Sequence, residues 1–73
     1  MITYEVQGRR TERGPGSEVR DVVRLESRPS RSEAFGVAEG IAAQRLTVWV
    51  FKAERRAGTL SYGLLGVVSS TGT

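Results

Sequence analysis

The sequence SRSEAFGVAEGIAAQRLTVWVF, residues 30–51, decides the fold of this chain. It opens with Ser-x-x-Glu, a capping-box pattern in which the serine hydroxyl accepts a hydrogen bond from the backbone amide of Glu33. Apolar residues then recur at helical spacing and predict a helix over residues 31–44. The β-branched and aromatic residues 46–51 predict a strand directly after it. We therefore expect one helix that packs on a sheet.

The predicted helix carries its apolar side chains on one face, which we expect to contact the sheet. Several of these residues are alanines, and small side chains let a helix lie close to the strands beneath it. The expected core stripe consists of Ala34, Val37, Ala38, Ile41 and Ala42, with Phe35 at its margin.

Two strands are predicted before the helix. Residues 2–7 alternate apolar and polar side chains at the period of two that a half-buried strand requires. Gly-Pro-Gly-Ser at residues 14–17 predicts a turn, and residues 19–27 predict the second strand of a long hairpin with an arginine-rich tip. The alternation of this second strand is broken at Asp21 and Val22, which predicts a β-bulge there.

Two strands are also predicted after the helix, at residues 46–51 and 59–68, with a polar turn over residues 52–58. In this ββαββ order the helix carries the chain back over one face, so the third strand pairs with the first in the spatial order 2-1-3-4. The expected fold is a two-layer α+β sandwich that forms a single domain over residues 1–68. Residues 69–73 are expected to be a flexible tail.

The composition of the 73-residue chain limits its chemistry, because it contains neither Cys nor His. Disulfides, thiolate nucleophiles, histidine bases and the usual zinc ligands are therefore not available. We expect no cofactor, no metal site and no catalysis. The apolar runs are too short for a membrane span and no secretory leader pattern is present, so we expect a cytoplasmic protein that does not bind membranes.

The third strand is apolar on both faces, although one helix can cover only one of them. We expect Leu46, Val48 and Val50 to face the helix. An exposed apolar patch on the other face of so small a domain indicates an interface with a second copy or another protein. The alternative is that sheet twist and long arginine side chains cover this patch within the monomer. The expected partner-binding residues on this face are Trp49, Phe51 and Tyr62.

The outward face of the predicted helix carries Gly36 and Gly40, beside Ser32 and Ala43. Glycine in a helix interior costs about 1 kcal/mol relative to alanine. Two glycines four residues apart therefore indicate a groove in which the backbone of a partner could dock. The alternative is that both are tolerated solvent positions.

Ten of the eleven basic residues are arginines, and the net charge is +3. The planar guanidinium binds phosphates and carboxylates through two parallel hydrogen bonds, so these residues are candidates for contacting nucleic acid or an acidic partner. The alternative is that arginine is abundant because of codon usage and that these residues have no binding role. The candidates are Arg9, Arg10 and Arg13 at one end of the expected sheet, and Arg55 and Arg56 at the other.

In its order of elements the chain resembles the small single-domain proteins with which phages and mobile elements inhibit host machinery, including some anti-CRISPR proteins. The resemblance extends from Thr-Tyr-Glu-Val at residues 3–6, through Ser-Glu-Ala at 32–34, to Leu-Thr-Val-Trp-Val at 46–50. It implies a non-catalytic protein that binds a protein partner and inhibits a host nucleic-acid machine. The alternative function is that of a small basic nucleic-acid-binding module.

Overall fold

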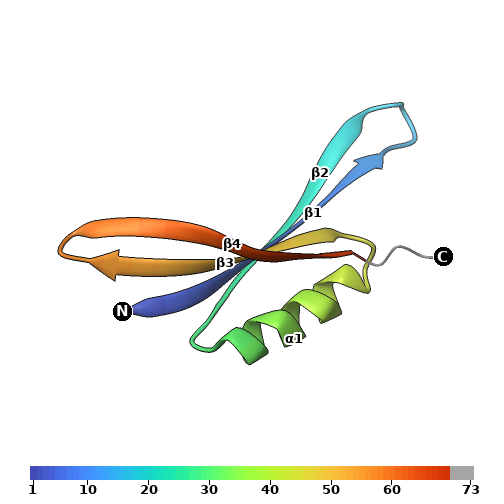
Figure 1. Ribbon diagram of the computed structural model, residues 1–73. Coiled ribbons are helices and arrows are strands. Elements are labelled where there is room, and N and C mark those ends of the chain that lie inside the picture. Colours follow the sequence, from blue (N-terminus) through green and yellow to red (C-terminus); the bar gives the residue numbers. More distant parts are fainter. Residues whose placement is uncertain (70–73) are drawn as a thin grey trace.

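The computed structural model describes residues 1–69 as a four-stranded antiparallel sheet with one helix across one face (Figure 1). The elements are β1 (Ile2–Arg13), β2 (Val19–Arg28), α1 (Arg31–Ala42), β3 (Thr47–Arg56) and β4 (Thr59–Ser69). The strand order across the sheet is β2-β1-β3-β4. The predicted ββαββ two-layer α+β fold is therefore confirmed.

Both hairpins are longer than the sequence predicts, because charged residues continue the strands. The chain was expected to turn over residues 52–58, but β3 runs to Arg56, whose Nε donates to Glu54 Oε2 at 2.7 Å. Only Ala57 and Gly58 form the turn, and both have positive φ (46° and 81°), as the commonest two-residue hairpin turn requires. Ser69, expected in the tail, pairs with Thr47; residues 70–73 lie outside the described part of the chain.

The sheet is strongly twisted, and its two hairpins point in different directions (Figure 1). β1 pairs with β3 only from Ile2 to Arg9, so the remainder of β1, up to Arg13, pairs with β2 alone. This end of the hairpin is a two-stranded extension, which we call the β1–β2 arm (residues 10–22). The Cα positions extend over 49 × 26 × 14 Å, so the molecule is elongated.

The predicted bulge at Asp21 and Val22 is wrong, because β1 and β2 pair without a register shift. Asp21 remains on the exposed face, where its carboxylate accepts a hydrogen bond from Thr11 Oγ1 at 3.4 Å and lies 3.6 Å from Arg9. These partners make a kink at Asp21 unnecessary. The register shift is found instead between β3 and β4, where Leu65 is the extra residue opposite the Val50–Phe51 step.

The helix begins as predicted. Ser30 has extended backbone angles, and its Oγ accepts a hydrogen bond from the backbone amide of Glu33 at 3.3 Å. The helix ends at Ala42, two residues before the predicted end. Four residues of the expected core stripe are buried (Ala34, Ala38, Ile41 and Ala42), while Phe35 and Val37 are half-buried at its edges.

The core lies between α1 and the two central strands. Val48 and Val50 are fully buried (0% exposed) and face the helix, as does Leu46, in agreement with the expected orientation of the third strand. The helix can approach because β1 carries glycine beneath it. A Cβ atom at Gly8 would lie 2.6 Å from Ile41 Cγ2 and 3.3 Å from Leu46 Cδ2.

Two Gly→Ala substitutions test this close approach. Gly8→Ala should lower the free energy of unfolding by about 1–3 kcal/mol, because the added methyl group overpacks the contact with α1. The matched control is Gly40→Ala, where an added Cβ meets nothing within 4 Å and the helix should gain about 0.5–1 kcal/mol. Urea unfolding followed by circular dichroism measures both. A Gly8→Ala variant as stable as the wild type would contradict the packing described.

Candidate functional site

The open face of the sheet is formed by side chains that point away from α1. The β1–β3 register places Gln7 opposite Trp49 and Glu5 opposite Phe51 on this face. Trp49 and Phe51 are both half-buried among their neighbours. The structure therefore places both predicted aromatic residues on the face that the helix leaves uncovered.

Apolar side chains of both edge strands border this face. On β4, Leu64 lies opposite Phe51, and Tyr62 projects on the same side. On β2, Leu25 lies opposite Gln7. The exposed fractions are 68% for Leu25, 60% for Tyr62 and 57% for Leu64. Removing this apolar surface from water would be favourable, so the face is suited to contact with another molecule.

A hollow of about 540 Å³ lies on this face between Leu25 and Tyr62, with Glu5, Gln7 and Phe51 also in its lining. A second hollow of about 260 Å³ shares Glu5 and Tyr62 with the first and extends past Leu60 to Arg55, so one of the predicted arginine candidates lies in its lining. We call the two together the open-face trough. It follows the central strands, and its walls come from the edge strands β2 and β4.

Glu5 places a carboxylate at the junction of the two hollows. Its cross-strand neighbours are Ser27 and Phe51. Within residues 1–69 its carboxylate takes part in no ion pair. A carboxylate beside apolar walls attracts a cationic or N–H donor group and forms stronger hydrogen bonds than a neutral acceptor does. The first hollow, whose lining contains no basic residue, is therefore complementary to a long basic side chain, whose stem is apolar and whose end is charged.

The predicted helix groove lies on the opposite side of the molecule. Gly36 and Gly40 are exposed on the outward face of α1, and a Cβ at either position would meet open space. The helix therefore separates this surface from Trp49, Phe51 and Tyr62. Because they lie on different layers, the glycines and the aromatic residues form two distinct surfaces. Docking at the glycines stays a prediction.

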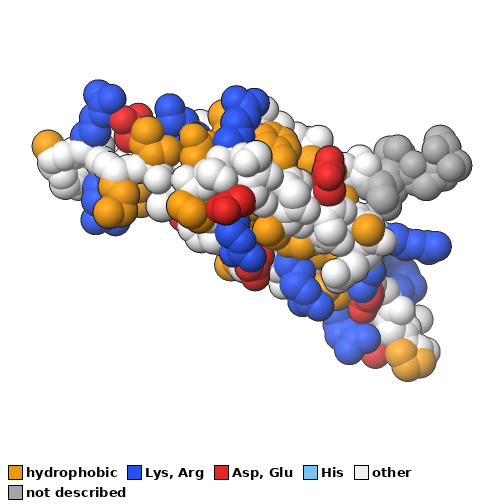
Figure 2. Space-filling model, turned by 90° about the horizontal axis from the view of Figure 1, so that it is seen from below, with side chains coloured by type: hydrophobic (Ala, Val, Ile, Leu, Met, Phe, Trp, Pro, Cys, Tyr) orange, Lys and Arg blue, Asp and Glu red, His pale blue; other side chains and the backbone are white. Residues whose placement is uncertain are grey.

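The predicted arginine candidates lie at two ends of the molecule, because Arg9 pairs with Thr47 at the start of β3 whereas Arg55 and Arg56 end that strand. Most of them contact acidic residues, and Figure 2 shows acidic side chains interspersed with the basic ones along the molecule. Arg13 and Arg55 are exposed and have no ion pair within residues 1–69. The ion pairs are Arg9–Asp21, Arg10–Glu12, Arg20–Glu12, Arg28–Glu26 and Arg56–Glu54.

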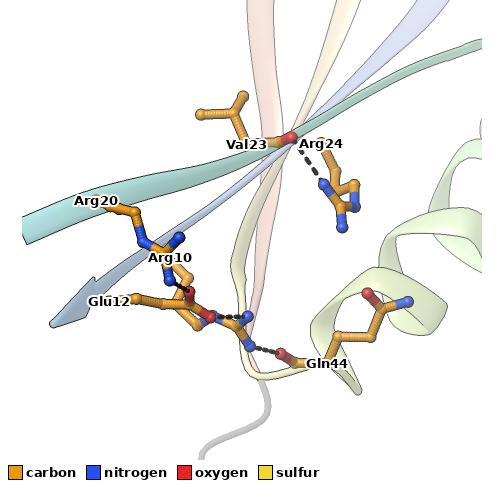
Figure 3. A network of polar contacts seen from close by, with 6 residues as sticks. All are labelled: Arg10, Glu12, Arg20, Val23, Arg24 and Gln44. Atoms are coloured by element: carbon orange, nitrogen blue, oxygen red, sulfur yellow. Dashed lines mark hydrogen bonds and ion pairs between the residues drawn. The ribbon is translucent and has the colours of Figure 1, made fainter. Parts of the chain in front are cut away.

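Arg10 joins the β1–β2 arm to the end of the helix (Figure 3). Its Nη1 donates to the backbone carbonyl of Gln44 at 2.6 Å, and its Nη2 donates to the carboxylate of Glu12. Glu12 also contacts Arg20, at 3.8 Å. The last turn of α1 has no basic residue of its own, and a cation near a helix C-terminus is stabilising. Arg10 therefore makes a structural contact, and its predicted contact with a partner stays a prediction.

Sequence reasoning left Glu5, Gln7 and Leu25 out of the candidate site. The signal for Leu25 was its position in the alternation of the second strand, which places it on the same face as Val23. In the sequence, Glu5 and Gln7 have only the pattern of polar residues that alternate with the apolar ones of the first strand. Their position in the trough depends on the neighbours that β3 and β4 supply, and these come from more than forty residues further along the chain.

Comparisons of the chain with models of protein families, with curated proteins and with solved structures found no match. The helix in the described part of the chain is too short to span a membrane. Residues 1–69 also contain no cluster of three or more His, Cys, Asp or Glu side chains that could hold a metal ion. The candidate site is therefore defined by the shape and the charge of the open face.

The link between the arm and the helix can be tested by stability. Arg10→Ala should lower the free energy of unfolding by about 1–2 kcal/mol, because it removes a charged hydrogen bond at the C-terminal end of α1 and leaves Glu12 without its nearest partner. The control is Arg13→Ala, which should change stability by no more than about 0.5 kcal/mol. Equal effects of the two substitutions in urea unfolding would show that the Gln44 contact is not stabilising.

Proposed function

We propose that this protein acts by binding another protein through the open face of its sheet. The observation that carries the proposal is the open-face trough, whose walls include exposed apolar side chains from both edge strands. A patch of this kind on a small domain is typical of protein interaction sites. Trp49, Phe51 and Tyr62 have the chemistry of interface anchors, because aromatic residues dominate interface energies.

The partner should present a basic side chain among apolar ones. Glu5 at the junction of the hollows would pair with the charge, and the ring of Phe51 or Tyr62 could add a cation–π contact. The hydrocarbon stem of a lysine or arginine would pack between Leu25 and Tyr62. In the first hollow, which has no basic residue in its lining, the same carboxylate would repel a phosphate backbone, so this hollow favours a protein partner over stacked nucleic-acid bases.

We further propose that binding is the whole activity and that no reaction is catalysed, since the chain supplies neither a histidine base nor a thiol. The most specific form of this proposal is inhibition: a small protein of the anti-CRISPR kind would occupy a surface that a host nucleic-acid machine needs. Its site of action would be the cytoplasm. The support is the small size of the chain, its order of elements and its open sheet face.

Nucleic-acid binding is the second candidate, and one observation favours it. Arg20, Arg24 and Arg28 follow one another on the helix side of β2, at the outer edge of the sheet. Arg20 and Arg28 contact carboxylates, while Arg24 is exposed and, within residues 1–69, donates only to the neighbouring backbone carbonyl of Val23. This row would contact phosphates, and binding through it would weaken steeply with salt.

The two candidates predict different results in affinity purification from a nuclease-treated native extract. Wild-type protein should recover a protein partner, and Leu25→Ser or Glu5→Arg should reduce recovery at least about tenfold, because each removes a complementary feature of the trough. Glu18→Ala, at the exposed tip of the β1–β2 arm and outside both candidate surfaces, is the matched control and should bind like wild type. A partner that is recovered from an untreated extract but lost after nuclease treatment, and whose recovery depends on Arg24 rather than on Leu25, would contradict the proposal. This result would support the nucleic-acid alternative.

A further inference from the structure

The two edges of the sheet have very different compositions. Edge strands carry unpaired backbone N–H and C=O groups, and natural proteins protect them with charged residues or proline. β2 follows this rule, whereas none of the eleven residues of β4 is charged or proline. The charged residues of the ten-residue β2 are Arg20, Asp21, Arg24, Glu26 and Arg28.

The contrast extends to the whole chain. All eleven basic and eight acidic residues precede residue 57, so β4 belongs to a continuous uncharged segment. Two copies of a protein with a net charge of +3 repel each other, and the repulsion is least where an interface is remote from the charges. The outer edge of β4 comes nearest to this condition, because the strand itself is uncharged and the nearest charged residues lie on its inner side, on β3. These residues are Lys52, Glu54, Arg55 and Arg56.

We propose that two copies of this chain pair β4 with β4 and form one continuous antiparallel sheet. A two-fold axis perpendicular to the sheet would relate the copies and keep both helices on the same side. Because side chains alternate with a period of two, only registers that pair residues of equal parity keep the open faces together. This inference goes beyond the proposed function, since it concerns the edge of the sheet and a different partner.

The bulge selects the register. Leu65 interrupts regular pairing with β3, so the longer regularly paired part of β4 runs from Thr59 to Leu64 and a shorter one from Gly66 to Ser69. The centre of the longer part lies between Ser61 and Tyr62, and we place the two-fold axis at Tyr62 because this residue projects on the open face with Leu60 and Leu64. Tyr62 then lies opposite Tyr62 of the second copy, and Leu60 lies opposite Leu64 of that copy. Leu60 (43% exposed), Tyr62 (60%) and Leu64 (57%) all project on the open face and would cover one another across the junction.

Cysteine cross-linking tests this register, because the chain has no cysteine of its own. Residues directly opposite in an antiparallel pair have Cα atoms about 4.5–5.5 Å apart, within the range that a disulfide spans. Tyr62→Cys should therefore form a disulfide-linked dimer under mild oxidation. The control is Val23→Cys, an exposed open-face position on β2, which should stay monomeric on a non-reducing gel. Equal cross-linking of both variants would overturn the proposed register.

Sedimentation equilibrium tests the dimer itself. At tens of micromolar, wild-type protein should have twice the 8.0 kDa mass of the chain. Ser61→Lys combined with Gly63→Lys should raise the dissociation constant at least about tenfold, because the register places these lysines opposite each other twice. Neither Ser61 nor Gly63 lines the trough, so the double-lysine variant should still recover the protein partner. Leu25→Ser should show the opposite behaviour: it should lose the protein partner but still dimerise. A wild-type protein that remains at 8.0 kDa, or a fully dimeric double-lysine variant, would overturn the proposal.

Discussion

The close approach of α1 to the sheet is the constraint on which the rest of the structure depends. It requires a residue without a side chain at Gly8, where Ile41 lies on the strand, and small residues on the helix at Ala34 and Ala38, which are both fully buried. A helix held this close forms a thin core with Val48 and Val50. All of that core lies on one side of the sheet, so the other side remains available for other molecules.

The consequence is a molecule whose surfaces have separate properties. The helix side of the β1–β2 arm is covered with charged groups that contact one another, and Arg10 uses one of these contacts to stabilise the end of the helix. The open face combines apolar walls with the carboxylate of Glu5. The β4 edge has no charge at all. These differences in charge and polarity are the basis of both proposals, since they give each surface a partner of different chemistry.

Much of the fold could be predicted from the sequence because its signals are local. The Ser30 cap, the helix stripe and the alternation of β3 each involve residues within a few positions of one another, and together with the ββαββ order they predict the topology. The role of Gly8 could not be predicted, because the contact with Ile41 joins residues thirty-three positions apart. The contact of Arg10 with Gln44 spans thirty-four positions.

The prediction of strand ends failed for a related reason. Charged residues at the ends of β1 and β3 look like loop residues in isolation, but pairing with β2 and β4 keeps them within strands. The candidate site was predicted in part: the aromatic residues were placed on the correct face by the alternation of β3. The trough was not predicted, because its shape comes from the twist of four strands.

The central claim is that the helix side of the sheet holds the monomer together, whereas the open face contributes little to its stability. Urea unfolding of Val48→Ala and Leu25→Ala compares the two sides directly. Leu25→Ala removes the larger group, yet we expect Val48→Ala to cost about 1–3 kcal/mol and Leu25→Ala less than about 1 kcal/mol, since Leu25 is 68% exposed. A Leu25→Ala variant that loses more stability than Val48→Ala would contradict the account.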